Sequence, residues 1–227
     1  MSIELEQELN PTIRRNPERT RRLLLEAAVK LFAQKGRDGT SVDEICQASG
    51  VNCRMIYHYY GNKDGLYMAM LAHVYGRIRE IVVKPEKKSQ TLTEFIETLT
   101  ERYFRFLQAN PEFVAVLRWE NATGAEGIRA LDLNDFRSVY FEEAAKALGE
   151  QEVLKSSRNH SSNDYSTTDS SSTDKGMLII LTCCSLCGYY FSNQASMSNA
   201  FGFDIANPEF AEKWLTHIKQ VAVASFQ

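Results

Sequence analysis

The chain has 227 residues, of which 44% are hydrophobic and 24% are charged, and its formal net charge is −3. This composition is ordinary for a soluble globular protein and excludes a largely disordered chain, while the length allows one sizeable core or two small domains. The N-terminus lacks the basic start and apolar core of a secretory signal, and the longest apolar run, residues 177–191, is shorter than the roughly 20 residues that span a bilayer. We therefore expect a cytoplasmic protein without membrane contact.

The charge is divided unevenly along the chain. Residues 11–85 contain thirteen Lys and Arg against seven Asp and Glu, whereas residues 86–227 contain thirteen against nineteen. A basic end of this kind suggests a nucleic-acid or membrane contact on one side, although a modest excess also occurs on plain solvated surfaces.

Three Asn-Pro-Glu triplets, at residues 16–18, 110–112 and 207–209, each precede a segment with apolar residues at helical spacing. Asn caps free N–H groups at a helix start, Pro loses nothing at the first helical position, and Glu favours the positive end of the helix dipole. Each triplet therefore predicts the start of a helix, and the first helix runs from Pro17 to a stop at Gly36.

Two short helices are predicted next. Ser41 and Glu44 have the spacing of a capping box, and the helix that they start ends at Gly50. Asn52 can cap a second short helix that runs to about Tyr59. Two short helices joined by a tight glycine turn are typical of a helix-turn-helix, which places its second helix in the major groove of DNA.

The second of these helices has one apolar and one polar face. On a helical wheel Met55 and Ile56 lie on the inward side. The opposite arc contains Cys53, Arg54, Tyr57 and His58. An arginine can bind guanine O6 and N7 through two hydrogen bonds, while tyrosine hydroxyls and lysines bind phosphates and set the register on the duplex. The arc therefore predicts a DNA-contacting surface.

The residues of this region also match a family motif. The matching runs are Ser41-Val42, Ala48-Ser49-Gly50-Val51, and Tyr57-His58-Tyr59-Tyr60-Gly61-Asn62-Lys63-Asp64-Gly65-Leu66. In order and spacing, residues 17–74 resemble the DNA-binding domain of TetR-type transcriptional regulators. The resemblance implies an all-α fold with an N-terminal helix-turn-helix domain, joined by a long helix to a helical C-terminal domain.

The resemblance also implies a role for each matching residue. The implied contacts to the DNA backbone are Thr40 or Ser41, Tyr57, Tyr59 and Lys63, and those to bases are Asn52, Cys53 and Arg54. The family more often has a small residue where Arg54 stands, and Lys or another polar residue where Cys53 stands, so an operator preference cannot be transferred. For His58, a solvated side chain without a DNA contact and a contact to a base are equally compatible with the sequence. Tyr60 is expected to pack in the core with its hydroxyl at the surface.

Further helices are expected along the rest of the chain. They span about 65–82, 91–106, 111–119, 133–148, 176–199 and 208–226. Residues 84–88 are expected to form a hinge-like break. Residues 155–175 are so rich in Ser, Thr, Asp and Asn that we expect a mobile polar loop. The expected organisation is an N-terminal extension over 1–15, a helix-turn-helix domain over 16–64 and a helical domain over 65–227.

By the resemblance, residues 65–227 bind a small effector, and the last two helices pair with their copies in a homodimer. The segment 176–199 is apolar nearly all round, as a helix buried on both sides must be. Aromatic residues in such a domain more often form core than pocket, but pockets are also mostly apolar and aromatic. The candidate effector-binding residues are Tyr103, Phe106, Trp119 and Tyr140.

The cysteines are an odd number without a regular framework, which indicates reduced thiols. They are Cys46, Cys53, Cys183, Cys184 and Cys187. The last three form a cluster, yet no second pair completes the four ligands of a structural zinc site, so no metal is expected. Packing as small buried residues is favoured, and a thiol-based redox or metal sensor is the alternative.

The patterns predict a DNA-binding regulator, and the resemblance implies a homodimer, most often a repressor in this family, which a small effector releases from a palindromic operator. An activator is the less favoured alternative. We expect no enzyme and no cofactor, because the histidines form no catalytic or metal-binding motif; they are His58, His73, His160 and His217. The expected partners are an operator in double-stranded DNA, a small-molecule effector and a second copy of the chain.

Overall fold

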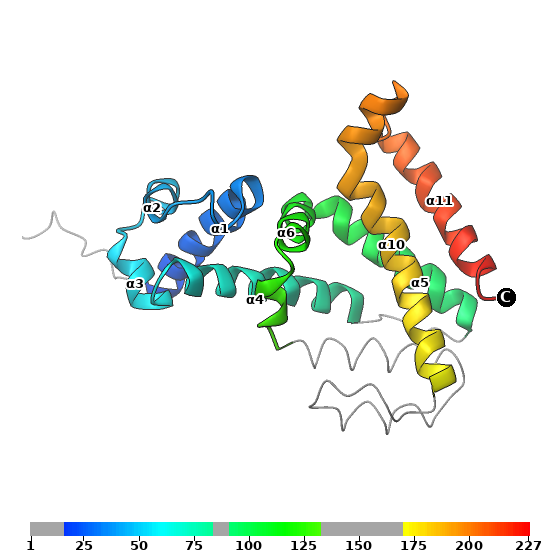
Figure 1. Cartoon of the computed structure of the whole chain (residues 1–227), viewed down its shortest axis with the longest axis horizontal. Coiled ribbons are helices and arrows are strands. Elements are labelled where there is room, and N and C mark those ends of the chain that lie inside the picture. The colour runs from blue at the N-terminus through cyan, green and yellow to red at the C-terminus, as the bar shows by residue number, and fades with distance from the viewer. Residues whose placement is uncertain (1–15, 84–90, 133–169) are drawn as a thin grey trace, which may run out of the picture. The chain divides into compact units, whose positions relative to one another are not determined.

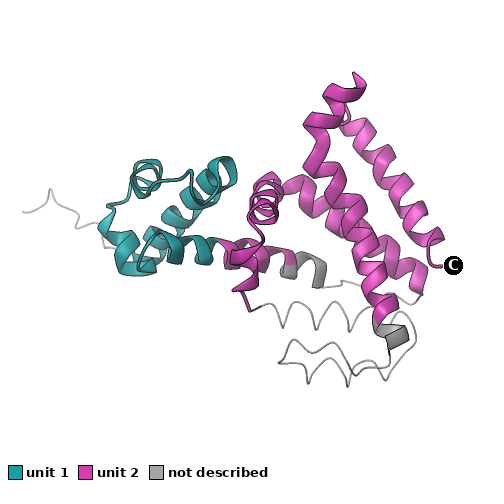
Figure 2. Cartoon of the chain, viewed as in Figure 1, with its two compact units in different colours: residues 1–70 teal, residues 71–227 magenta. Residues whose placement is uncertain are grey.

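The computed structural model describes residues 16–83, 91–132 and 170–227, and its regular elements in these ranges are all α-helices (Figure 1). This confirms the predicted all-α fold. The chain divides between Met70 and Leu71 into two compact units, unit 1 and unit 2 (Figure 2). The N-terminal extension, the break at 84–88 and the helix expected over 133–148 lie outside the described residues.

The first helix, α1 (Pro17–Lys35), begins and ends as its sequence predicts. The Asn16 side chain accepts a hydrogen bond from the Arg19 N–H at 3.0 Å, and Pro17 occupies the first helical position. Gly36 closes the helix at a positive φ of 71°, and its N–H donates to the Phe32 carbonyl. These caps satisfy groups that every helix end otherwise leaves unpaired.

The helix-turn-helix consists of α2 (Val42–Ser49) and α3 (Arg54–Tyr60). The capping box is present at α2, because Ser41 Oγ accepts from the Glu44 N–H at 3.2 Å and Glu44 Oε2 accepts from the Ser41 N–H at 2.8 Å. Gly50 has the left-handed φ of 67° that the turn requires. The long helix α4 (Lys63–Val83) follows and contributes its first turns to unit 1.

Unit 1 has a core made of one side of each helix. Its most deeply buried side chains are Leu24, Ala28 and Phe32 of α1, Ile45 of α2, Ile56 of α3, and Leu66 and Met70 of α4. The Phe32 ring meets the Tyr67 ring edge to face, with centroids 4.9 Å apart. Burial of this apolar surface stabilises the two short helices, α2 and α3, which could not persist alone.

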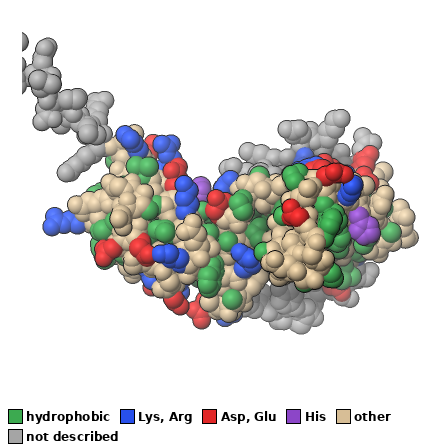
Figure 3. Space-filling model, turned by 90° about the horizontal axis from the view of Figure 1, so that it is seen from above, with side chains coloured by type: hydrophobic (Ala, Val, Ile, Leu, Met, Phe, Trp, Pro, Cys, Tyr) green, Lys and Arg blue, Asp and Glu red, His purple; other side chains and the backbone are tan. Residues whose placement is uncertain are grey.

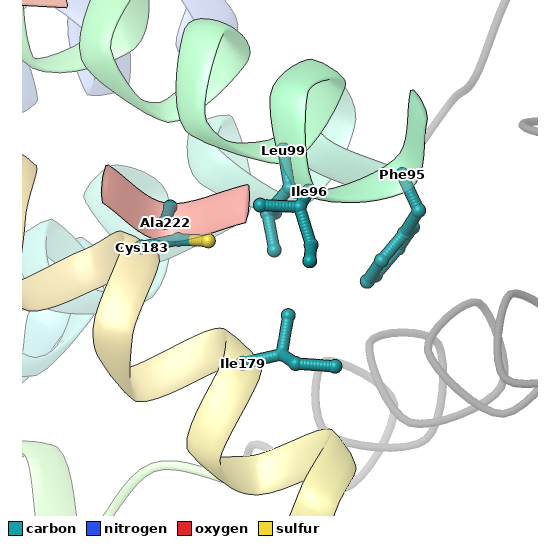
Figure 4. Close-up of a cluster of buried hydrophobic side chains, with 6 residues drawn as sticks. All are labelled: Phe95, Ile96, Leu99, Ile179, Cys183 and Ala222. Carbon is teal, nitrogen blue, oxygen red and sulfur yellow. The ribbon is translucent and has the colours of Figure 1, made fainter. Parts of the chain in front are cut away.

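Unit 2 contains α5 (Leu92–Ala109), α6 (Pro111–Ala122), α7 (Glu126–Arg129), α10 (Ser170–Phe201) and α11 (Pro208–Ala224). Side chains of α5, α10 and α11 meet in one buried cluster (Figure 4). The cluster contains Phe95, Ile96, Leu99, Ile179, Cys183 and Ala222. The α10 helix begins at Ser170, so residues 170–175, which we expected in the polar loop, are helical. The remainder of that expected loop lies outside the described residues.

The short helix α7 was not predicted from the sequence. Gly124 and Ala125 turn the chain at positive φ angles of 81° and 57°, and the buried Glu120 carboxylate accepts the Ile128 N–H at 2.9 Å. A buried carboxylate that binds a backbone eight residues later leaves no periodic trace in a sequence. This contact therefore escapes pattern analysis.

The α10 helix contains residues 174–201, which by length and composition alone could cross a membrane. The apolar run 177–191, which is too short to span a bilayer, is only part of this helix. The helix continues through Ser, Asn and Met residues to Phe201. A long core helix of a globular domain passes the same test. Contacts of α10 with α5, α6 and α11 support that interpretation.

The Glu44 carboxylate makes stability sensitive to acid. Its hydrogen bonds with Lys35 and then with Ser41 lower its pKa from 4.5 to about 2. Because the folded-state pKa is depressed, the carboxylate stabilises the fold fully above its unfolded pKa, and this stabilisation is lost as pH falls from about 4.5 towards 2. We expect Glu44→Gln to lower the urea midpoint at neutral pH and to flatten its dependence on pH in that window. Parallel curves for Glu44→Gln and the parent chain would contradict this, and Glu26→Gln on the exposed side of α1 is the control.

Candidate nucleic-acid interface

The recognition helix α3 is held in unit 1 by contacts at both ends and in the middle. Ile56 is fully buried in the core. Asn52 Oδ1 accepts the Arg54 N–H at 2.9 Å at the start of the helix, and the Tyr60 hydroxyl donates to the Arg21 carbonyl of α1 at 3.2 Å. Burial raises the pKa of Tyr60, which fits its predicted role in packing. These contacts set which face of α3 points to solvent.

The outward face of α3 is the one that the helical wheel predicts. Arg54 and His58 are exposed, and the Tyr57 side chain is 57% exposed. The half-buried Tyr59 lies beside them, with its ring 4.8 Å from the His58 ring and the Arg21 guanidinium 4.7 Å from its centroid. The structure therefore brings two cations, an imidazole and two phenols to one side of unit 1.

Lys63 lies in a position that sequence reasoning did not anticipate. Its Nζ donates to the carbonyls of Arg37 and Thr40, at 3.0 and 3.1 Å, and the side chain is half-buried. Two of its three N–H donors thus hold the turn between α1 and α2 in place. The third donor is left for any contact outside this turn.

Thr40 is not available as the sequence reasoning expected. Its side chain is 1% exposed, and its hydroxyl donates to the carbonyls of Gly36 at 2.8 Å and Leu31 at 3.2 Å. The single hydroxyl proton is shared between these two carbonyls, so the hydroxyl is used inside the fold. Thr40 therefore supports the interface from inside, and Ser41 is the exposed residue of the pair.

Cys53 also differs from its predicted role. Its sulfur is bonded to that of Cys46 in α2, and their Cα atoms are 5.4 Å apart. The expectation that all five cysteines are reduced is therefore wrong for this pair. The sequence shows that both residues flank the turn of the helix-turn-helix. Only the folded turn brings their side chains together.

Salt bridges neutralise part of the charge in unit 1. Arg37 pairs with Asp64 at 2.9 Å, and Lys35 pairs with Glu44. The Asp64 hydrogen bond raises the pKa of Arg37, so this guanidinium stays charged. Positive and negative side chains are interspersed on the face shown in Figure 3. Arg54 on the outward face of α3 and Arg21 over the Tyr59 ring add positive charge to this unit.

The predicted effector residues do not line one described cavity. Tyr103 and Phe106 are buried in unit 2, Trp119 is 40% exposed, and Tyr140 lies outside the described residues. Phe106 packs edge to face on Phe113, with centroids 5.1 Å apart. A cavity of about 310 Å³ elsewhere in unit 2 is lined by Leu107, Gln108, Pro111, Val114, Arg118, Phe191, Gln194, Ala206 and Ala211.

The cysteines of α10 are packing residues. Cys183 and Cys187 are fully buried, and Cys187 Sγ lies 3.6 Å from the Thr100 carbonyl. Burial raises the pKa of all three thiols, that of Cys184 to about 12. Among the described residues no group of three or more His, Cys, Asp and Glu side chains can hold a metal ion. The structure thus gives the sensor alternative no support in this cluster.

Comparison with known proteins places these features in a family. The family model of bacterial regulatory proteins, tetR family, matches residues 24–70, which contain α2, α3 and most of the core of unit 1. The HTH-type transcriptional repressor NicS of Pseudomonas putida is 30% identical over 213 residues, which are 91% of this chain and 92% of that protein. The HTH-type transcriptional regulator BetI of Rhizobium meliloti is 29% identical over 113 residues, 49% of this chain and 56% of that protein.

The likeness to solved structures extends over nearly the whole chain. The fatty acid degradation regulator FadR from Bacillus halodurans has a TM-score of 0.61 at 16% identity, covering 92% of this chain and 96% of its own. A tetR-family transcriptional regulator from Streptomyces coelicolor has a TM-score of 0.57 at 21% identity, covering 92% and 84%. At these identities the likeness shows the fold. The relative from Pseudomonas putida, matched over more than nine-tenths of both chains, and the family model establish that the chain belongs to the tetR family of bacterial regulatory proteins.

Proposed function

We propose that this protein is a homodimeric transcriptional repressor that binds a near-palindromic DNA operator and is released from it by a small-molecule effector. The exposed side of α3 carries the proposal, because it places Arg54, Tyr57 and His58 outward from a helix that the core holds in place. A relative matched over 91% of this chain is named a transcriptional repressor. A helix of this kind fits the major groove of DNA.

The DNA contacts divide into base reading and backbone binding. Arg54 is the proposed base-reading residue, since a guanidinium can bind guanine through two hydrogen bonds. Tyr57, Tyr59, Ser41 and the remaining donor of Lys63 are the proposed phosphate contacts. Asn52, His58 and the backbone at Thr40 complete the proposed surface. The side-chain oxygen of Asn52, Oδ1, already accepts the Arg54 N–H as the cap of α3.

An exposed apolar stripe on α10 supports the homodimer. Leu178 and Leu181 are 56% and 53% exposed, and Tyr189 is 58% exposed. Spacings of three, eight and eleven residues put them on one side of a helix, with the small Ser185 between them. His217 and Val221, four residues apart, give α11 an exposed side as well. A second copy that covers these stripes would remove apolar surface from water.

An effector would act through unit 2. Tyr75 packs edge to face on Phe113, with centroids 5.5 Å apart, and Tyr103 and Phe106 are buried nearby in α5. We propose that this aromatic region, with Trp119 and Tyr140, holds an apolar or amphipathic small molecule. The α4 helix contributes residues to both units, so it can transmit a tilt to α3. Typical couplings of this kind are about 1–3 kcal/mol.

The first test is the DNA specificity of Arg54. We expect the chain to select a near-palindromic site from random duplex DNA. Arg54→Ala should weaken binding to that site by about 1–3 kcal/mol and relax the preference at one base pair in each half-site. The readout is the selected sequence and the affinity for it. An unchanged selected sequence would show that Arg54 reads no base, and selection of no site by either protein would refute the proposed function.

The second test separates phosphate binding from fold support. Tyr57→Phe should weaken binding to specific and random DNA about equally and leave the melting temperature unchanged, since the hydroxyl is exposed. Lys63→Met should lower the melting temperature as well, because the carbonyls of Arg37 and Thr40 lose their donor. Lys30→Met, which removes an exposed lysine of α1 outside the proposed surface, is the control. Loss of sequence preference in Tyr57→Phe would contradict a phosphate contact.

The third test concerns the dimer. Replacing both Leu178 and Leu181 with Glu should convert the dimer to a monomer at micromolar concentration, because charges would be buried without partners. Sedimentation equilibrium gives the mass, and helical circular dichroism checks the fold. Phe203→Glu, at an exposed aromatic residue between α10 and α11, should leave the dimer intact. If the double variant remains a dimer, the interface lies elsewhere on the chain.

A further inference from the structure

We propose that Cys46 and Cys53 are a reversible oxidation site within the helix-turn-helix. Peroxide converts the two thiols to a disulfide that holds the start of α3 against α2. The two sulfurs are bonded in the structure, and the Cα separation of 5.4 Å lies within the range of native disulfides. Cys46 belongs to α2, and Cys53 directly precedes Arg54 at the start of α3. The bond therefore joins the two helices across their turn.

The two sulfurs differ in their access to solvent. Cys46 is 8% exposed in the core of unit 1, whereas Cys53 is half-buried. Cys53 is thus the thiol that peroxide reaches first, and Cys46 is the thiol that completes the bond. The Cys53 thiolate attacks hydrogen peroxide, forming a sulfenic acid and hydroxide. The Cys46 thiolate then attacks the Cys53 sulfur and expels hydroxide, which takes up a proton to form water. Two electrons pass from the thiols to the peroxide, and a dithiol reverses the reaction.

Asp43 controls how fast this pair reacts. Its Oδ1 lies 3.9 Å from Cys53 Sγ, and a carboxylate at this distance opposes the charge of a thiolate. The thiolate is the reactive form, so the parent chain should oxidise slowly at neutral pH. The pair then responds to a sustained oxidant. Removing the carboxylate with Asp43→Asn should accelerate disulfide formation by about threefold or more.

The remaining cysteines do not compete for the oxidant. Cys183 and Cys187 are fully buried, and burial raises the pKa of both thiols and of Cys184. Protonated thiols are poor nucleophiles, so the cluster in α10 stays reduced while the pair in unit 1 oxidises. The oxidation is therefore confined to the DNA-facing unit.

A disulfide at this place acts on the helix that presents Arg54 to solvent. The α3 helix has seven residues, and the side chain at its N-cap position, Cys53, does not cap the free N–H groups of the helix. Fixing Cys53 to α2 restricts fraying at the N-terminal end of α3 and pre-orders the side chains that follow it. We expect the oxidised protein to bind its operator about 3- to 10-fold more tightly than the reduced protein. This last step rests on the proposed function, whereas formation of the bond does not.

The experiment uses the full-length chain, reduced with dithiothreitol and then treated with hydrogen peroxide. Alkylation with mass spectrometry identifies which thiols are consumed, and hydrogen exchange over residues 53–60 measures the order of α3. The expected result is a linked pair at Cys46 and Cys53, three free thiols in α10 and slower exchange in α3. Affinity for the selected DNA site is measured in both states.

Matched variants assign the response. Cys53→Ser and Cys46→Ala should each abolish the change in exchange and affinity, while Cys184→Ser, in unit 2, should retain it. Free thiols at Cys46 and Cys53 after peroxide would overturn the oxidation site. A linked pair with equal operator affinity in both states would overturn its effect on DNA binding. A linked pair with slower exchange but without DNA binding in either state would leave the oxidation site standing and refute the proposed function instead.

Discussion

A helix of seven residues does not form by itself in water, and the outward surface of unit 1 depends on such a helix. The nucleation of α3 costs more than its own hydrogen bonds return, so its stability comes from its surroundings. Ile56 anchors it in the core, and Tyr60 binds the backbone of α1. The direction of every side chain on its exposed face follows from these two contacts.

The polar residues around α3 divide into those that hold the helix-turn-helix and those that face outward. Thr40 and Lys63 use their donors on carbonyls at the end of α1 and in the turn that follows. The side-chain oxygens of Ser41 and Asn52 accept backbone N–H groups at the starts of α2 and α3. This arrangement leaves Arg54, Tyr57 and His58 as the outward group, whose geometry the supporting residues define. On the proposed function, loss of a supporting residue should weaken DNA binding and stability together, whereas loss of an outward residue should weaken DNA binding alone.

Unit 2 is built around one long helix with unequal sides. Ile179, Cys183 and Cys187 of α10 are completely buried against neighbouring helices, while Leu178 and Leu181 face solvent. Small buried residues let α5 and α11 approach closely, which explains why cysteines occupy these positions without any reactive role. An apolar side left uncovered in one chain is a surface suited to a second chain. The same helix thus serves as core on one side and as a proposed interface on the other.

The sequence by itself determined most of the longer helices and several of their starts, because caps and periodicity are local. Asn16 with Pro17, Ser41 with Glu44, and Thr91 with Glu94 act within a few residues, and each pair starts a helix where the pattern predicts. The outward arc of α3 was predictable for the same reason. Family resemblance, carried by the spacing of the tyrosines and Lys63, then indicated the class of protein.

Only the tertiary structure decided how polar side chains are used, because their partners come from other helices. The sequence predicts DNA contacts for Thr40 and Lys63, and only the structure shows that the Thr40 hydroxyl and two donors of Lys63 bind carbonyls at the end of α1 and in the next turn. It treated Cys46 and Cys53 as separate thiols, but the glycine turn at Gly50 folds one back on the other. Glu120 became the partner of a backbone N–H in α7 in the same way. A hydrogen bond between distant residues has no period in the chain, so it becomes visible only when the fold brings its two ends together.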